Sequence, residues 1–498
     1  MHSEHSASGL VSVERVGGTG PTVASLVVGV GQRDEPAHLA GITHLTEHLL
    51  FRLAEPDALF TDGVTDVSTV SFSASGSLGE AVAFLGRITL AIRNIRDLTD
   101  EQINLERKIL EAEMAMSYHE AIPSLATVRF GTKGFGLAGA GNPAVATITR
   151  HEVIDWVETW FTADNALVTI VGHLDGEAAL TLPLGTSPRP ARIKDVASIT
   201  TPVIVPSVKA GVALSLLVSV DDAASLDHAL WWEFIQSLRL DRGLCYSVEV
   251  HVNRIDQDLA SLDVILDPVP DRTGETVVAA ITLLRTIADT GFSPAAIERV
   301  RQSVAMTRLN PDDVSRLQLE NLVGERLLGY SSCDVDEDLA RGATVDSKQL
   351  GETLRGSLDS LIVMYDEDAE VGDLAALTGI GVDELEPISP ISRTEFRSRA
   401  RSQGSRRWRS NLVPALSRGW ATIDNGVLLF SGPMGGWAID VASAVLLGRR
   451  PGENDVVMIL GPDGRRFNVW AGDWWRGSSL LDAIVESASC DRVRHFPA

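Results

Sequence analysis

The sequence contains few cysteines, few lysines and no long apolar run. Its three cysteines (Cys245, Cys333 and Cys490) lie far apart in 498 residues, at spacings typical of neither disulfides nor metal clusters. No stretch approaches the about 20 uncharged apolar residues that span a bilayer. The opening residues, MHSEHSASGL, lack the basic and apolar regions of a secretory signal. These absences exclude a disulfide-stapled miniprotein, and they predict a cytoplasmic protein without a membrane span.

Positive charge is also scarce. There are 43 lysines and arginines, of which five are lysines, against 67 aspartates and glutamates, and the net charge is −24. A surface of this charge repels nucleic acid and anionic membranes, so we expect neither as a partner. Acidity that only keeps a large protein soluble is the alternative explanation. Hydrophobic residues reach 44%, enough for each of the about three domains that the length suggests to bury a core.

The chain resembles itself at a distance of about 194 residues. Apolar residues spaced three and four apart predict helices over 78–92 and 273–287, and buried strands are predicted over Ala166–Val171 and Ser360–Met364. A period this long indicates a duplicated domain. The predicted fold class is therefore α+β, with two homologous layered α/β-sheet domains that form a clamshell. Their predicted ranges are 1–190 and 200–385.

The composition changes after residue 385. Seven arginines interrupt the acidic sequence in segment 386–410, which we predict to be a linker, solvated or docked on acidic neighbours; binding of nucleic acid or phosphoinositide is the alternative. The last fifth of the chain holds six of the ten tryptophans, two hairpin signatures and an apolar helical stripe over 480–485. Residues 411–498 are therefore predicted to form a small, mainly-β domain with a closing helix and a tryptophan-containing core. This arrangement weakly resembles a pleckstrin-homology-type fold.

The segment His44-Leu45-Thr46-Glu47-His48 combines two histidines and a glutamate on one predicted helix. Residues four apart on a helix lie on one face, so both imidazoles can reach the same ion. A carboxylate at Glu47 can hold and deprotonate a water on that ion. The pattern H-x-x-E-H is the signature of the inverzincins, zinc peptidases whose motif runs in reverse order. An amphipathic helix that carries two histidines by chance is the alternative.

A third metal ligand is predicted on a following helix. Glu106 and Glu113 are seven residues apart, which places them within about 20° of each other on one helix face. Stacked carboxylates repel each other unless a cation lies opposite, and zinc enzymes usually hold the ion by three protein ligands. We therefore predict a Zn²⁺ site made by His44, His48 and Glu113, with a solvated acidic helix face as the alternative.

These residues resemble the pitrilysin/insulinase family of zinc peptidases, which includes mitochondrial processing peptidase. The likeness extends to Val27–Glu35, Gly141-Asn142-Pro143 and 165–175, and it covers about residues 10–385. It implies His44, His48 and Glu113 as zinc ligands and Glu47 as the general base. It also implies that Glu106 is a carboxylate behind the ligands that supports the site.

The second half matches another motif of the same family. The segment from Leu238 to Tyr246 resembles the family's Leu-Arg-x-x-x-Gly-Leu-x-Tyr segment. The resemblance implies that Arg239 binds the peptide and that Tyr246 stabilises the oxyanion; without it, ordinary packing explains both residues. Which edge strand receives the peptide stays open, with Val67–Ala74 as the candidate.

The resemblance implies a zinc metalloendopeptidase that hydrolyses unfolded or short peptides. A specific hypothesis is the processing of leader peptides during peptide maturation. The resemblance also implies a homodimer or a heterodimer with a related chain. A non-catalytic scaffold subunit that presents substrate within a heterodimeric processing peptidase is the alternative function.

One glycine-rich pattern in the sequence predicts no site. Gly134-x-Gly136-x-x-Gly139 matches a dinucleotide-binding fingerprint. That fingerprint requires a strand before it and a helix after it, whereas no strand is predicted before Gly134 and Pro143 follows. We therefore expect no nucleotide cofactor.

Overall fold

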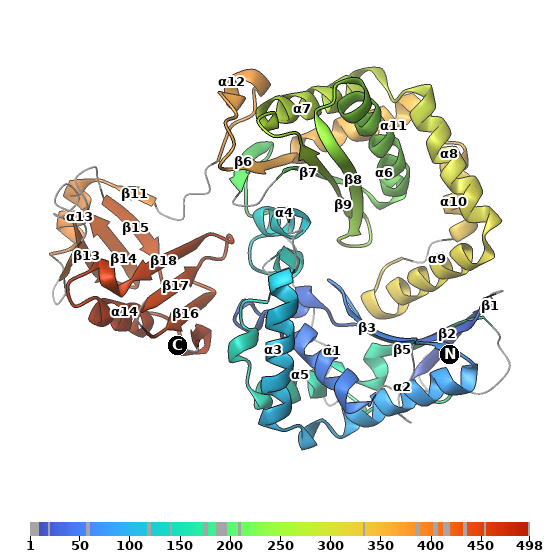
Figure 1. The fold of residues 1–498 in the computed structure, drawn as a ribbon, viewed down its shortest axis with the longest axis horizontal. Coiled ribbons are helices and arrows are strands. Elements are labelled where there is room, and N and C mark those ends of the chain that lie inside the picture. Colours follow the sequence, from blue (N-terminus) through green and yellow to red (C-terminus); the bar gives the residue numbers. More distant parts are fainter. Residues whose placement is uncertain are drawn as a thin grey trace.

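The computed structural model describes residues 9–17, 20–55, 60–116, 121–139, 142–172, 178–185, 197–207, 211–331, 334–383, 389–401, 407–411, 419–431, 436–452 and 455–496. They form a first unit that ends at residue 185, a second unit over 197–383 and a C-terminal unit over 389–496. In Figure 1 the first unit lies below the second, and the C-terminal unit lies at their side. No helix of the described ranges is both long and apolar enough to cross a membrane.

The first unit is a five-stranded sheet with helices on one face. The strand order is β1-β5-β2-β4-β3, in which β1 runs parallel to β5 and the other pairs are antiparallel. The strands are β1 (Ser12–Gly17), β2 (Thr22–Val28), β3 (Thr61–Thr65), β4 (Val70–Gly76) and β5 (Ala166–Gly172). The helices are α1 (Ile42–Leu53), α2 (Leu78–Arg93), α3 (Asp100–Met116), α4 (Ala121–Phe130) and α5 (Arg150–Trp160). Leu26, Phe72 and Val168 point from the sheet into a core shared with α1 and α2.

The second unit repeats this topology. Its sheet has the order β6-β10-β7-β9-β8, again with one parallel pair at the β6 edge. The strands are β6 (Val203–Ser207), β7 (Val212–Ser219), β8 (Cys245–Arg254), β9 (Leu259–Pro268) and β10 (Ile362–Asp366). The helices are α6 (Val220–Phe234), the π-helical η8 (Ile235–Asp241), α7 (Thr273–Thr290), α8 (Pro294–Leu309), α9 (Pro311–Val323), the π-helical η9 (Gly324–Leu328), α10 (Val335–Ala343), α11 (Ser347–Ser357) and α12 (Leu374–Thr378). The predicted fold class, two homologous α/β-sheet domains and a small mainly-β unit, is confirmed.

The C-terminal unit contains two sheets, with the orders β11-β15-β14-β13-β12 and β18-β17-β16-β19. The strands are β11 (Ser389–Ile391), β12 (Arg407–Arg409), β13 (Trp420–Asp424), β14 (Val427–Ser431), β15 (Gly436–Asp440), β16 (Leu446–Arg450), β17 (Val456–Leu460), β18 (Arg466–Trp470) and β19 (Val493–His495), and the helices are α13 (Arg393–Arg399) and α14 (Gly477–Glu486). Both predicted hairpins form, as β13–β14 and β17–β18. The helix predicted to close the domain is α14, but β19 follows it and pairs with β16.

The arginine-rich segment that we predicted as a linker supplies three elements of the C-terminal unit. Strands β11 and β12 form the two edges of its first sheet, and α13 packs on β14 through Phe396. Arg399 pairs with Asp424 at 3.0 Å. The sequence pattern did not reveal these elements because each is short; the large buried side chains are Phe396 on α13 and Trp408 on β12. Arg406 lies outside the described residues.

Contacts on two sides of the molecule hold the first and second units together. Arg129 of α4 is only 2% exposed, and its guanidinium donates to the carbonyl oxygens of Ser360 and Ser215, each at 2.8 Å. On the other side of the molecule, α9 and η9 lie on the first sheet (Figure 1), where Leu327 packs against Val27. The sheet face opposite the core is therefore partly covered by the second unit.

Candidate metal centre

The N-terminus of α1 is held by a buried carboxylate. Glu35 accepts hydrogen bonds from the backbone N–H groups of Gly41 (2.7 Å) and Thr43 (2.8 Å), which the helix itself leaves without partners. Burial raises the pKa of Glu35 to about 7, although these hydrogen bonds favour its charged form. Gly41 has φ +101°, and a Cβ there would lie 2.5 Å from Val145, so only glycine fits this start of the helix.

Amphipathicity orients the motif on α1. Leu45 and Leu49 are fully buried in the core. His44 and His48 are four residues apart on another face, and their ring centroids are 4.8 Å from each other. The predicted helix and its orientation are confirmed.

The structure brings the three predicted ligands together. Nε2 of His44 lies 3.9 Å from Oε1 of Glu113, and Nε2 of His48 lies 3.6 Å from Oε2 of Glu113. One donor atom from each of the three residues lies within 4.8 Å of the other two. Two imidazole nitrogens and one carboxylate oxygen are a donor set that suits zinc and leaves a fourth position open. The three residues therefore fit a zinc ion.

A second layer of side chains fixes the imidazoles. Nδ1 of His48 lies 3.2 Å from Oε2 of Glu106, whose other oxygen accepts a hydrogen bond from Arg52. If Nδ1 of His48 donates to Glu106, the lone pair of Nε2 is free to face a metal. Glu106 is buried, so the predicted support of the ligands by this carboxylate fits its position.

Asn142 supports His44 in the same way, a contact that the sequence analysis did not assign. Its side-chain amide lies 3.2 Å from Nδ1 of His44, and its Oδ1 is buried without a hydrogen-bond partner among the described residues. Metal binding through Nε2 requires that Nδ1 carries the hydrogen and donates it. Rotation of the amide by half a turn would place Oδ1 as the acceptor, which satisfies both groups.

Glu47 lies beside this cluster and is 6% exposed. Its Oε2 is 4.0 Å from Nε2 of His44. Burial, followed by repulsion from Glu113, Asp62 and Glu106, raises the pKa of Glu47 to about 8. This carboxyl therefore favours a proton far more than an exposed glutamate does, as a group that accepts and returns a proton should.

A cleft of about 540 Å³ opens between Glu47 and β3. It is lined by residues of α1, α3 and β3, namely Glu47, His48, Phe51, Arg52, Thr61, Asp62, Gly63 and Glu106. Strand β3 is the outermost strand of the sheet on this side, and β4 lies inside it. Our candidate for the peptide-binding edge, Val67–Ala74, is therefore wrong, because most of it belongs to β4, which β3 covers.

Arg239 and Tyr246 contact each other in the second unit. The guanidinium of Arg239, on η8, lies 5.9 Å from the centroid of the Tyr246 ring, near the start of β8. The Tyr246 side chain is 74% exposed. In Figure 1, β8 and α1 lie in different units, well apart from each other. Neither Arg239 nor Tyr246 lines the cleft at Glu47, whose lining comes from α1, α3 and β3.

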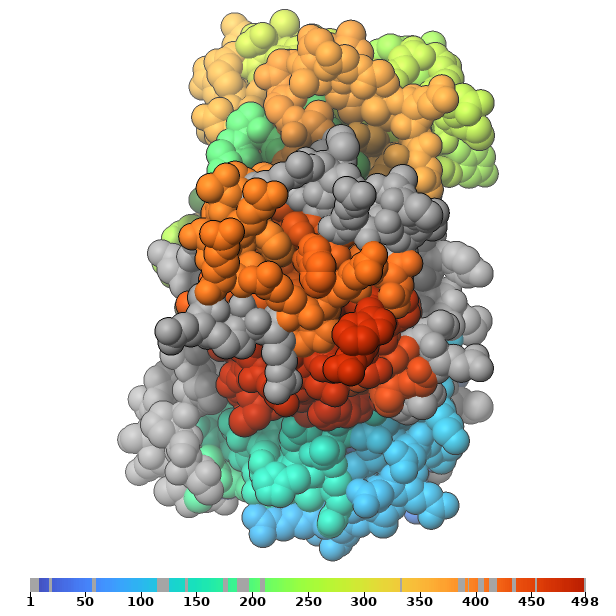
Figure 2. Space-filling model, turned by 90° about the vertical axis from the view of Figure 1, so that its left-hand side faces the viewer, coloured from blue at the N-terminus to red at the C-terminus, as the bar shows by residue number. Residues whose placement is uncertain are grey.

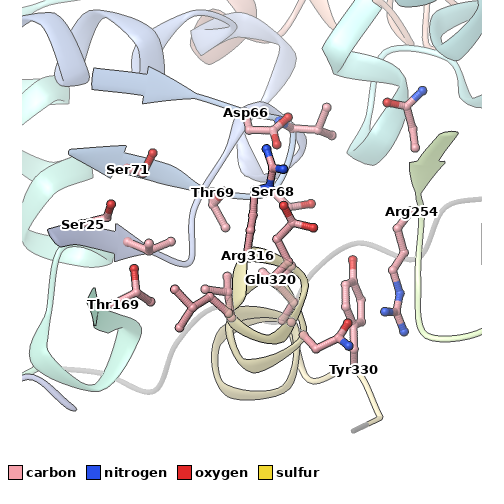
Figure 3. Close-up of a pocket in the computed structure, with 18 of the residues that line it drawn as sticks. Ser25, Asp66, Ser68, Thr69, Ser71, Thr169, Arg254, Arg316, Glu320 and Tyr330 are labelled. Carbon is pink, nitrogen blue, oxygen red and sulfur yellow. The ribbon is translucent and has the colours of Figure 1, made fainter. Parts of the chain in front are cut away.

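A larger cavity of about 960 Å³ lies between the first sheet and the second unit (Figure 3). On one wall, Ser25, Ser71 and Thr169 project from three neighbouring strands. On the other wall, Arg316 and Glu320 project from α9, beside Tyr330. The β3–β4 turn at Asp66 lines the same cavity, so β3 runs from the cleft at Glu47 to its rim.

The other patterns of the sequence carry no site. Gly134–Gly139 forms a 3₁₀ segment that follows α4, and no strand precedes it, so a dinucleotide site has no place there. Its Phe135 and Leu137 are buried in packing. Cys333 lies outside the described residues.

Comparison with known proteins agrees with this fold, and zinc proteases are among the similar proteins. No model of a protein family matches the chain. An uncharacterized zinc protease of Mycobacterium tuberculosis (strain ATCC 25618 / H37Rv) is 26% identical over 177 residues, which are 31% of this chain and 39% of that protein; its counterpart in Mycobacterium bovis gives the same values. The matched part thus spans about two fifths of these relatives.

Solved structures share the fold. Pitrilysin superposes with a TM-score of 0.51 and 14% identity over 76% of this chain and 49% of its own. A peptidase M16 inactive domain from Pseudomonas fluorescens superposes with a TM-score of 0.54 and 13% identity over 72% of this chain and 96% of its own. The first two units have the fold of M16 peptidases, and the chain is similar to zinc proteases.

Proposed function

We propose that the protein is a zinc endopeptidase that hydrolyses unfolded or short peptides. The observation that carries the proposal is the convergence of His44, His48 and Glu113, backed by Glu106, with Glu47 beside them. A zinc ion held by the three ligands would supply Lewis acidity that polarises a peptide carbonyl. Glu47 would take a proton from the attacking water and return it to the amine of the leaving fragment.

The peptide would bind as an added strand on β3. An edge strand offers unpaired N–H and C=O groups to an extended segment, and Gly63 of β3 lies directly beside Glu47. A segment that follows β3 past Thr65 would reach the cavity at Asp66. Only unfolded peptides can adopt this extended form, which supports peptides rather than folded proteins as substrates. The processing of leader peptides remains our specific hypothesis for the substrate.

Arg239 and Tyr246 would act on the substrate from a second chain. Within one chain neither residue lines the cleft at Glu47, and Tyr246 is exposed. A homodimer, or a heterodimer with a related chain, could place one chain's second unit opposite the other chain's zinc ligands. In a mixture of Glu47→Gln and Tyr246→Phe chains, a homodimer with shared sites would recover about a quarter of wild-type activity. No recovery would contradict shared sites.

The central test of the proposed function is the Glu47→Gln variant. Purified wild-type protein should cleave a mixture of peptides of about 10–30 residues, read by mass spectrometry, and Glu47→Gln should lower the rate by at least about 100-fold while zinc stays bound. Cleavage that survives the substitution would contradict the mechanism. A scaffold subunit is the second candidate, because an inactive domain shares the fold; a wild-type chain that binds zinc and cleaves nothing would favour it.

A further inference from the structure

The C-terminal unit is docked on the first unit near the metal centre. Figure 2 shows its red part directly above the teal and blue part of the first unit. The N–H of Thr132 donates to the carbonyl oxygen of Pro462 at 3.1 Å, and its hydroxyl donates to that of Gly461 at 2.9 Å. At Gly464 (φ +85°) a Cβ would lie 2.6 Å from Thr127, so the β17–β18 turn approaches α4 as closely as glycine allows.

A second contact reaches the segment directly before α1. Val445 packs on Ala37, Ala40 and Leu137. The carbonyl oxygen of Ala40 accepts a hydrogen bond from the N–H of Ala144 at 3.1 Å. Val445 thus supports a segment that is bonded to the loop of Asn142, the residue that contacts His44.

A third contact is an ion pair at the first turn of α5. Arg494 and Glu152 are 2.8 Å apart, and the Arg494 side chain is only 11% exposed. Burial alone would raise the pKa of Glu152, but the hydrogen bonds from Arg494 and Thr149 outweigh it and hold that pKa below its usual value. Helix α5 packs against α1, so the ion pair between Arg494 and Glu152 also fixes a helix that contacts α1.

We propose that the C-terminal unit is a positioning element of the metal centre. Val445 and Arg494 hold segment 36–41, the Asn142 loop and α5, and so fix the start of α1 with the His44 imidazole. Glu35 caps the start of α1 through the N–H groups of Gly41 and Thr43, and Val445 packs on Ala37 and Ala40, which lie between Glu35 and Gly41. This inference rests on the proposed function, which assigns the zinc ligands. Its effect on the backbone order of residues 36–44 is nevertheless expected whether or not a metal ion is bound.

The test uses the full chain with interface substitutions. Val445→Asp places a charge in the apolar contact, Arg494→Met removes the ion pair, and Val445→Ile and Arg466→Met are the controls, since Arg466 is exposed on β18. In protein treated with a chelator, amide hydrogen exchange of residues 36–44 should be about tenfold faster in Val445→Asp and Arg494→Met. Exchange of α11, which packs on α7 in the second unit, should stay as in the wild type.

Zinc affinity gives the second measurement, by competition with a chelator. Both interface variants should bind zinc about tenfold more weakly, the lower end of the effect of losing support around a ligand, whereas Val445→Ile and Arg466→Met should keep wild-type affinity. Wild-type exchange of residues 36–44 in both interface variants would overturn the inference. If wild-type protein binds no zinc, the proposed metal site fails, while the exchange measurement still decides whether the C-terminal unit orders this segment.

Discussion

Gly63 and Glu47 lie in contact in the lining of the cleft: a Cβ on Gly63 would lie 2.1 Å from Oε1 of Glu47. Edge strand β3 therefore passes the proposed general base so closely that a side chain larger than that of glycine would have to displace the Glu47 carboxylate. The same contact explains how a peptide added to β3 would pass directly in front of that carboxylate. It also makes Gly63 a residue at which a single methyl group should disturb the chemistry.

Gly63→Ala should lower peptide cleavage by about 10- to 100-fold, because the methyl group displaces the Glu47 carboxylate from its place. The zinc content should not change, since Gly63 does not contact the three ligands. Gly79→Ala is the matched control: a Cβ at Gly79 meets nothing within 4 Å, and alanine suits helix α2. Equal cleavage by the two variants would contradict the claim that catalysis depends on the position of the Glu47 carboxylate beside Gly63.

Glu106→Gln should weaken zinc binding by about 10- to 100-fold, because Gln cannot give His48 and Arg52 the charged acceptor that Glu106 provides. Competition with a chelator measures this. Glu111→Gln, an exposed position on the same helix, should bind zinc like the wild type. Equal affinity of both variants would remove Glu106 from the site.

The pH dependence of stability should carry a signature of Glu35. Its folded-state pKa of about 7 lies above the unfolded value of 4.5, so its contribution is complete below about pH 4.5 and is lost as the pH rises through 7. Between pH 5 and 8, the thermal midpoint of metal-free wild-type protein should therefore fall more than that of Glu35→Gln. Parallel pH curves for the two proteins would show that Glu35 does not titrate in this range.

Arg129→Met should loosen the contact between the first two units. It leaves three acceptors without a donor and deprives buried Asp263 of its nearby cation, a loss of about 3–5 kcal/mol. The thermal midpoint should drop by several degrees, whereas Arg308→Met, at an exposed position on α8, should leave it unchanged. If Arg129→Met melts like the wild type, this arginine does not hold the units together.

Local patterns allowed much of the fold to be predicted. The spacing of His44, Glu47 and His48 on α1, and of Glu106 and Glu113 on α3, follows from helical periodicity, which the sequence displays directly. The duplicated topology followed from the repeat of apolar positions. Both depend on neighbours in the sequence, and the structure agrees with both.

Features that depend on distant residues could not be predicted in this way. Strand β3 (TDGVT) lacks a clear alternation of apolar and polar residues, and only its pairing with β4 defines it. The role of Asn142 depends on a contact with a histidine 98 positions away. The arginines of 393–409 suggested a linker, solvated or docked on acidic neighbours, because the sequence does not show that Phe396 would pack on Leu429 or that Arg399 would pair with Asp424.

The most direct test of the central claim is the zinc content of the protein purified without added metal or chelator. Elemental analysis should find about one zinc per chain in the wild type, and His48→Ala should lose it, because two protein ligands hold zinc far more weakly than three. His151→Ala, at an exposed histidine away from the cluster, should keep the metal. Wild-type protein without zinc, or zinc that stays after His48→Ala, would contradict the site on which the proposed peptidase depends.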